Sequence, residues 1–226
     1  LLVSGILVLS LAFSAQAAVS LAAGPELVVL RHEIRRYERL KFSYELEGGH
    51  PEDSPWFRDT LRARRMVAWM RAKLGDRVFE HLPDEASGLP AVQKRLNKKL
   101  WRQGVVREYG GFRPLRLERL KASPELIVLR LETWMSDDDS VYVFRRDGNA
   151  WQKALRVDTG MVVEKLLDVK EADGGVLLLL QGYDSWGPSS WRQLKYRLYR
   201  LPKSGPVRLL AKDDGETVLH RAMPLE

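Results

Sequence analysis

The hydrophobic pattern of the chain changes about halfway along its length. Over residues 25–111 apolar side chains recur mostly every three or four positions, which is the spacing of amphipathic helices. From Phe112 onward they alternate or form short runs between turn residues, which is typical of strands. The sequence therefore predicts an α+β protein, with a basic, mainly helical region at 25–111 and an antiparallel β region at 112–226.

The residues before position 50 predict a helix followed by a strand. Apolar residues share one helical face over 26–38, namely Leu27, Leu30, Ile34 and Tyr37. The pattern then alternates strictly over 40–46, and Gly48-Gly49 is typical of a chain reversal. We therefore expect a helix over 26–38 and a half-buried strand over 40–46.

Two further helices are expected before the β region. Ser54 and Pro55 are typical of a helix start and predict a helix over 56–74, which Gly75 would end. A third, strongly basic helix is predicted over 90–103. Both helices carry an apolar stripe that would face a shared core.

The β region predicts seven or eight strands arranged as an antiparallel meander. They are expected over 126–134, 141–146, 151–157, 161–169, 176–183, 194–201, 207–211 and 217–220. Asp147-Gly148-Asn149 predicts a tight hairpin turn. The pattern of 126–157 returns about 50 residues later, so we expect a repeated four-stranded unit. A single sheet and a small sandwich are both compatible with that pattern.

The first 24 residues carry no charge, and residues 1–13 are strongly apolar. The small residues Ser14-Ala15-Gln16-Ala17 follow in the spacing of a signal-peptidase site. We therefore expect residues 1–24 to hold a signal peptide that is cleaved near Ala17. The alternative is an uncleaved membrane anchor, because the uncharged stretch is just long enough to span a bilayer.

No linker rich in Pro, Gly or Ser separates the helical region from the β region. We therefore expect 25–226 to form one continuous domain, with two domains as the alternative. The chain contains no cysteine, which excludes a thiolate nucleophile and any cysteine-ligated metal site.

The net charge of +7 is concentrated in the first half of the chain. Residues 25–124 hold 22 Lys and Arg against 14 Asp and Glu, whereas residues 125–226 hold 15 against 16. The densest basic stretch is the third predicted helix, whose candidate contacts with an anionic surface are Lys94, Arg95, Lys98, Lys99 and Arg102. The alternative is an ordinary solvated helix face.

One loop of the β region is unusually rich in aromatic residues. Its candidate ligand-binding residues are Tyr183, Asp184, Trp186 and Trp191, because aromatic rings beside a carboxylate suit stacking on sugar rings. The alternative is packing against the sheet. The other tryptophans, at positions 56, 69, 101, 134 and 151, lie in predicted helices or strands, so we expect them in the core or at its edge.

No recognisable catalytic or cofactor motif is present. His32-Glu33 lacks the second histidine of a zinc-protease motif, and the chain has no phosphate-binding or dinucleotide-binding glycine pattern. Asp137-Asp138-Asp139 lacks the alternating ligands of a calcium loop, so we expect an exposed loop there. The sequence thus predicts no catalytic residue, no metal site and no cofactor.

These features favour an exported protein of the bacterial envelope, secreted or periplasmic, that acts as a non-enzymatic binding or accessory module. The expected partners are anionic envelope components or a glycan. Nucleic acid is not expected, and membrane attachment is expected only through an uncleaved N-terminal segment. The alternative function is a secreted or periplasmic hydrolase of glycan or peptide, with catalytic residues scattered along the sequence.

Overall fold

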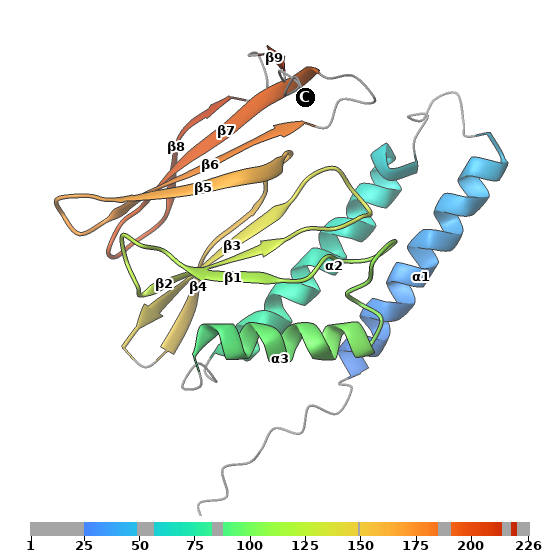
Figure 1. Cartoon of the computed structure of the whole chain (residues 1–226), viewed down its shortest axis with the longest axis horizontal. Coiled ribbons are helices and arrows are strands. Elements are labelled where there is room, and N and C mark those ends of the chain that lie inside the picture. Colours follow the sequence, from blue (N-terminus) through green and yellow to red (C-terminus); the bar gives the residue numbers. More distant parts are fainter. Residues whose placement is uncertain are drawn as a thin grey trace, which may run out of the picture.

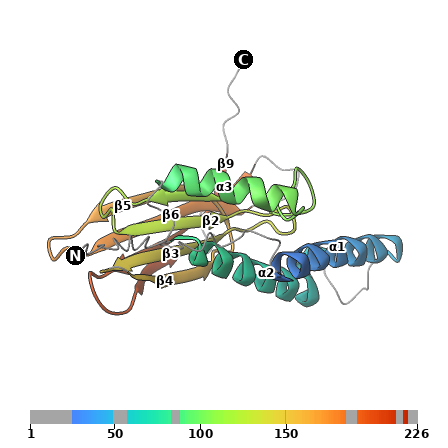
Figure 2. The ribbon, with the colours of Figure 1, turned by 90° about the horizontal axis from the view of Figure 1, so that it is seen from below.

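The computed structural model describes residues 25–48, 57–82, 88–148, 150–184, 191–213 and 218–220. Within these ranges helices pack on one face of an antiparallel sheet, and a second antiparallel sheet packs on its other face (Figure 1). Figure 2 shows α1 as the outermost helix, with α2 between it and the strands. None of the described helices has both the length and the apolar character that a membrane-spanning helix needs.

The helices are α1 (Pro25–Leu46), α2 (Leu61–Glu80) and α3 (Leu89–Arg102), with a short 3-10 helix η1 (Phe57–Asp59) before α2. The first sheet contains β1 (Arg116–Arg119), β2 (Leu126–Leu131), β3 (Ser140–Asp147) and β4 (Ala150–Asp158), in that order. The second sheet contains β5 (Val162–Lys170), β6 (Val176–Asp184), β7 (Trp191–Leu201) and β8 (Arg208–Asp213), also in chain order. A short strand β9 (Val218–His220) pairs with β7 as well.

The α+β class and the antiparallel meander are confirmed. The repeated unit that the sequence predicts appears as two four-stranded meanders, β1–β4 and β5–β8. The predicted hairpin joins β3 to β4, and its Gly148 adopts the positive φ of 57° that such a turn requires.

The predicted strand over 40–46 is wrong, because α1 continues as a helix to Leu46. Leu40 and Tyr44 are four positions apart and extend the buried stripe of α1, and Tyr44 packs on the ring of Phe57 at 5.7 Å between ring centroids. The alternate residues Phe42 and Leu46 point outward and are 61% and 71% exposed. Residues four positions apart lie on the same face in both a strand and a helix, so the spacing alone does not distinguish them. The packing of Tyr44 against Phe57 of η1 favours the helix.

Helix α2 differs from its prediction at both ends. Ser54 and Pro55 lie outside the described residues, and the helix begins after Thr60, whose Oγ1 accepts a hydrogen bond from the Ala63 N–H at 3.2 Å. Gly75 does not end the helix, which continues to Glu80. Gly75 instead leaves room for the ring of Tyr142, which lies against its α-carbon.

Helix α3 closes the free edge of the first sheet. The Leu117 N–H donates to Oε1 of Gln93 at 2.6 Å, and Asn97 both accepts from the Leu115 N–H at 2.7 Å and donates to the Leu115 carbonyl at 3.0 Å. These amide side chains satisfy backbone groups that an edge strand leaves unpaired. The remaining polar face of α3 is thereby fixed in an outward orientation.

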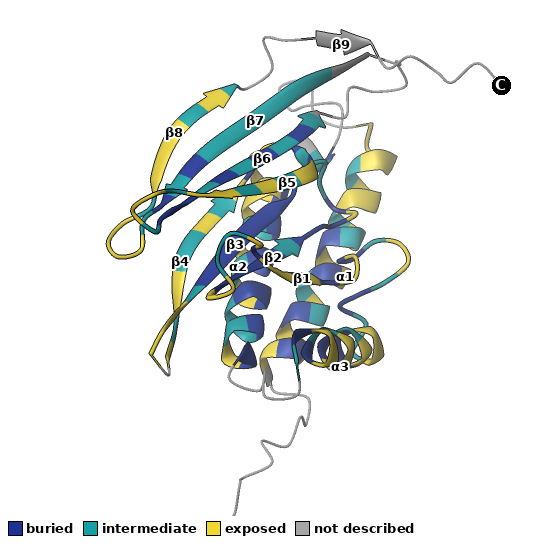
Figure 3. Cartoon of the chain, turned by 60° about the vertical axis from the view of Figure 1, so that its left-hand side comes forward, coloured by how far each residue is buried: buried dark blue, intermediate teal, exposed yellow. Residues whose placement is uncertain are grey.

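Strand β2 is buried on both of its faces. Ile127 and Leu129 belong to the core beneath the helices, whereas Leu126 and Val128 belong to the core between the two sheets. Figure 3 shows that β2 and β3 are the most continuously buried strands of the molecule. This two-sided burial explains why β2 is apolar without alternation from Leu126 to Leu129.

Strand β6 also contains a continuous apolar run, from Val176 to Leu180, but it lies in a different environment. Leu178 and Leu180 are buried between the sheets, whereas Leu177 and Leu179, on the other face, are only half-buried. The neighbouring strand β5 exposes Leu167 and Val169. No helix among the described residues packs on this outer face of the second sheet.

We predict that Gly75→Ala destabilises the protein, although alanine is the better helix former by about 1 kcal/mol. The added Cβ would lie 2.5 Å from Cε1 of Tyr142, a buried ring whose hydroxyl donates to the Arg71 carbonyl. Overpacking of this kind reduces the free energy of unfolding by about 1–3 kcal/mol, which urea denaturation measures. In a Tyr142→Leu background the same substitution should be neutral or stabilising. A gain in stability from Gly75→Ala alone would contradict this packing.

Candidate functional site: the basic face of helix α3

The outer face of α3 carries only positive charge. Lys94, Arg95, Lys98 and Arg102 are exposed on it, and the 14 residues of the helix include no acid. Together with Ala91 and Gln103 these side chains line an open groove along the helix. The positive field of this face is therefore not cancelled by carboxylates of the same helix.

Lys99 lies at the border of this face and is 9% exposed. Its Nζ has no hydrogen-bond partner among the described residues. Burial lowers the pKa of Lys99, and the positive charge of Arg77 on α2 lowers it further. An anionic group bound in the groove beside Lys99 would supply the counter-charge that its ammonium lacks.

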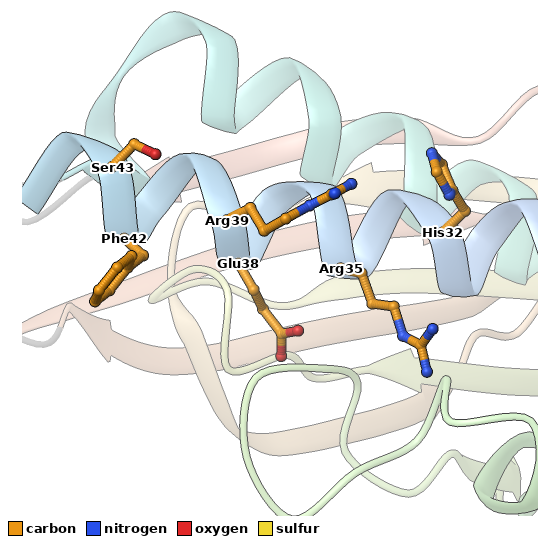
Figure 4. A pocket seen from close by; sticks show the side chains of 6 residues that line it. All are labelled: His32, Arg35, Glu38, Arg39, Phe42 and Ser43. Carbon is orange, nitrogen blue, oxygen red and sulfur yellow. The ribbon is translucent and has the colours of Figure 1, made fainter.

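Helix α1 also presents cations, which Figure 4 shows together with the acid Glu38. His32, Arg35 and Arg39 follow one another along the helix, and Phe42 lies one turn further on, in an open pocket of about 660 Å³. The same helix carries acids that form ion pairs, among them Arg36–Glu33 at 3.4 Å. Because α1 mixes charges of both signs and α3 does not, α3 is the stronger candidate for anion contact.

The connection after α3 packs against α1. Gly104 follows α3 with a φ of 69°, and its α-carbon lies beside the side chains of Arg31 on α1 and of Arg107. Arg107 in turn pairs with Glu38 of α1 at 2.7 Å. The end of α3 is therefore held next to the start of α1, as Figure 1 also shows.

Two exposed aromatic rings lie on this side of the molecule. Tyr109 is 73% and Trp134 is 45% exposed, with their ring centroids 5.7 Å apart. The guanidinium of Arg113 stacks over Trp134 at 3.9 Å, as a cation on an aromatic face. This pair is an aromatic surface that the sequence does not identify, because Tyr109 and Trp134 are 25 positions apart.

The expectation that all five remaining tryptophans lie in or near the core is wrong for three of them. Trp69, Trp101 and Trp134 are 40%, 55% and 45% exposed. Trp101 falls outside the apolar stripe of α3, and Trp134 lies beyond the end of β2. Trp151 is half-buried against the helical core, and Trp56 lies outside the described residues.

The predicted aromatic ligand loop lies largely outside the described residues. Trp186 is not described. Asp184 is the last residue of β6 and Trp191 is the first residue of β7, and the structure describes only their backbone. Tyr183 is half-buried at the end of β6, where it is paired with Leu194. The ligand-binding role of these four residues therefore stays a prediction.

The triple-aspartate segment is not the exposed loop that the sequence predicts. The segment packs around Arg71 of α2, whose side chain is 3% exposed. The guanidinium of Arg71 contacts both carboxylate oxygens of Asp138, at 3.0 and 3.2 Å. Ser136 accepts from the same guanidinium at 2.7 Å, and Asp137 pairs with Arg58 at 2.8 Å. The loop is ordered because a buried cation from the helical layer requires these partners.

Asp139, the last residue of the triplet, is buried between the layers. Its Oδ2 accepts a hydrogen bond from the Val163 N–H of the second sheet at 2.8 Å. Burial raises the pKa of Asp139 to about 6, and the neighbouring charge of Glu132 also raises it, whereas the Val163 hydrogen bond and the charge of Arg130 act in the opposite direction. Asp139 thus links the sheets at the edge of their shared core.

Two acids with one raised pKa would suit general acid–base catalysis if a substrate could reach them. Asp139 is 4% and Glu132 is 7% exposed, and Arg130 forms an ion pair with Glu132. This arrangement is a largely buried ion cluster. Among the described residues no group of three or more His, Asp or Glu side chains is placed to hold a metal ion.

We predict that Asp139→Asn changes how stability depends on pH. The pKa of this carboxyl rises from 3.8 to about 6 on folding. Its contribution to the free energy of unfolding is therefore largest below pH 3.8 and is lost as the pH rises to 6. Asparagine keeps an oxygen for the Val163 N–H but does not titrate. As the pH rises from 4 to 7, the free energy of unfolding of the variant should therefore increase relative to that of the natural protein by up to about 3 kcal/mol. Urea denaturation at each pH measures this difference.

Asp138→Asn is the matched control with the opposite sign. Burial alone would raise the pKa of Asp138, but the charge of Arg71 and hydrogen bonds from Arg71 and Ser136 lower it. Asp138→Asn should destabilise the protein at neutral pH, with a penalty that shrinks as the pH falls through the folded-state pKa. The same pH trend in both variants would overturn the assignment of opposite roles.

The chain was also compared with protein-family models, curated proteins and solved structures. No family model matches it, and neither a curated protein nor a solved structure gives a match. None of the three comparisons therefore assigns it a family, a relative or a ligand.

Proposed function

We propose that this protein is a non-enzymatic binding module of the bacterial envelope, and that the outer face of α3 is its contact with anionic envelope material. The observation that carries the proposal is a helix face with four exposed cations and no acid. Lipid phosphates and lipopolysaccharide phosphates are the anions that such a face would meet outside the cytosol.

The attachment of α3 to the sheet supports this role. Gln93 bonds to the backbone of β1 at Leu117, and Asn97 bonds to the backbone of Leu115 just before it, so the cations are presented from a fixed support. The buried ammonium of Lys99 adds a group whose charge is unfavourable in the free protein. A phosphate bound beside Lys99 would offset that desolvation penalty by supplying an opposite charge.

Export rests on the apolar leader and the small residues that precede position 18. If the leader is a signal peptide, the protein isolated from its own cells should begin at Ala18 and be found outside the cytosol. N-terminal sequencing of each cell fraction checks this. A cytosolic protein that retains residues 1–24 would exclude the envelope role, whatever α3 binds.

We predict that reversing three charges on α3 weakens binding to anionic vesicles. The variant is Lys94→Glu, Lys98→Glu and Arg102→Glu, measured by co-sedimentation with vesicles of phosphatidylglycerol and phosphatidylcholine. A surface cation is worth about 1 kcal/mol at an anionic bilayer, so the affinity should fall at least about 100-fold. Binding of the natural protein to these vesicles should weaken steeply as salt is added.

The matched control changes three exposed cations of the β region by the same total charge. It carries Lys121→Glu, Lys165→Glu and Arg208→Glu. If α3 is the contact face, this control should lose far less affinity than the α3 variant. Equal losses would show that net charge alone matters, and unchanged binding of the α3 variant would remove α3 from the proposal.

A further inference from the structure

A second candidate site lies at the far end of the two sheets from α1. Three connections meet there: the β1–β2 turn (120–125), the β5–β6 turn (171–175) and the β7–β8 connection (202–207). Toward the left of Figure 1 the first two of these turns project from the ends of their strands. Between them lies a cleft of about 270 Å³.

The cleft has an apolar floor and a cationic rim. Its floor includes Leu126, Val176 and Leu201, which belong to the core between the sheets. The rim carries Arg145 from β3, Lys170 from the end of β5 and Lys203 from the β7–β8 connection, against the single acid Glu125. Three separate segments thus bring positive charge to one opening over an apolar surface.

The cations of the rim have no carboxylate partners in the described part of the chain. Arg145 makes one long contact, from Nη1 to the Gly205 carbonyl at 3.5 Å, and its Nη2 is buried without a hydrogen-bond partner. The nearby acids are already engaged: Glu171 and Asp173 both pair with Arg200 at 2.8 Å. A guanidinium that has one buried nitrogen without a partner and that lacks a counter-ion favours an external anion.

The walls of the cleft are connected to one another before any ligand binds. The Ala122 N–H donates to Oδ2 of Asp168, which ties the β1–β2 turn to β5. The Arg146 N–H donates to the Glu125 carbonyl at 2.9 Å, which ties the same turn to β3. A cleft held in this way needs little ordering on binding, and that lowers the entropic penalty of recognition.

We propose that this cleft binds a small amphipathic anion, a carboxylate or phosphate group on a short apolar body, with Arg145 as the anchoring residue. The guanidinium holds the anionic group, Lys170 and Lys203 add to the attraction, and the apolar body rests on the floor of the cleft. The volume suits a ligand smaller than those of drug-sized sites, which occupy about 300–1,000 Å³. This site is independent of the α3 face and of the envelope role.

The test uses phenyl phosphate and benzoate as probes, with benzyl alcohol as a neutral analogue and inorganic phosphate as an anion without an apolar body. Binding to the full chain is followed by chemical-shift changes of backbone amides. Phenyl phosphate or benzoate should saturate shifts at the cleft, inorganic phosphate should bind more weakly, and benzyl alcohol should not bind. No saturable shift at the cleft with either probe up to about 10 mM would overturn the proposal.

Variants separate the cleft from general charge effects. Arg145→Gln should weaken phenyl phosphate binding by about tenfold or more, and Lys203→Gln by a smaller factor. The matched control is Arg146→Gln, which removes the exposed arginine next along β3 and should leave the affinity unchanged. Circular dichroism checks that each variant is folded. If Arg145→Gln does not fold, Lys203→Gln provides the test of the cleft. Equal losses in Arg146→Gln and the cleft variants would refute the assignment.

Discussion

Burial of both faces of the first sheet is the constraint on which the rest of the structure depends. Strands β2 and β3 carry apolar side chains on alternate sides, so neither side can face water without a large loss of free energy. The helices cover one side and the second sheet covers the other. The order of the layers follows from this requirement, and both proposed anion sites lie at the margins of these layers.

The junction between the layers also explains why charged residues are buried there. Arg71 reaches from α2 to the loop before β3, and Asp139 reaches from that loop to β5. Each buried charge is tolerated because hydrogen bonds and opposite charges surround it. The Asp137–Asp139 segment is therefore part of the scaffold, although its sequence resembles that of a solvated loop or a cation site.

The two proposed anion sites arise from different features of the same scaffold. On α3 the amide contacts with the edge strand fix one side of a helix and leave its cations on the opposite side. At the other end of the sheets, Arg145 has no carboxylate partner among the described residues, and Glu171 and Asp173 of the neighbouring turn pair with Arg200. The first site offers a broad charged surface, and the second offers a small cleft with an apolar floor.

The sequence by itself determined the α+β class, the start of the β region, the hairpin at Gly148 and the repeat that became two four-stranded meanders. It also identified the basic helix, because dense charge on one helix is visible in the order of residues. These properties depend on local spacing and turn chemistry, which the chain carries without its neighbours.

Only the tertiary structure decided the remaining features. Packing on η1 made residues 40–46 helical, the ring of Tyr142 kept Gly75 inside α2, and burial removed Lys99 from the solvated face. The aromatic pair, the Asp139 environment and the cleft at Arg145 each join residues that are far apart in the sequence. Burial and charge pairing are properties of such distant contacts, so no local pattern could have predicted them.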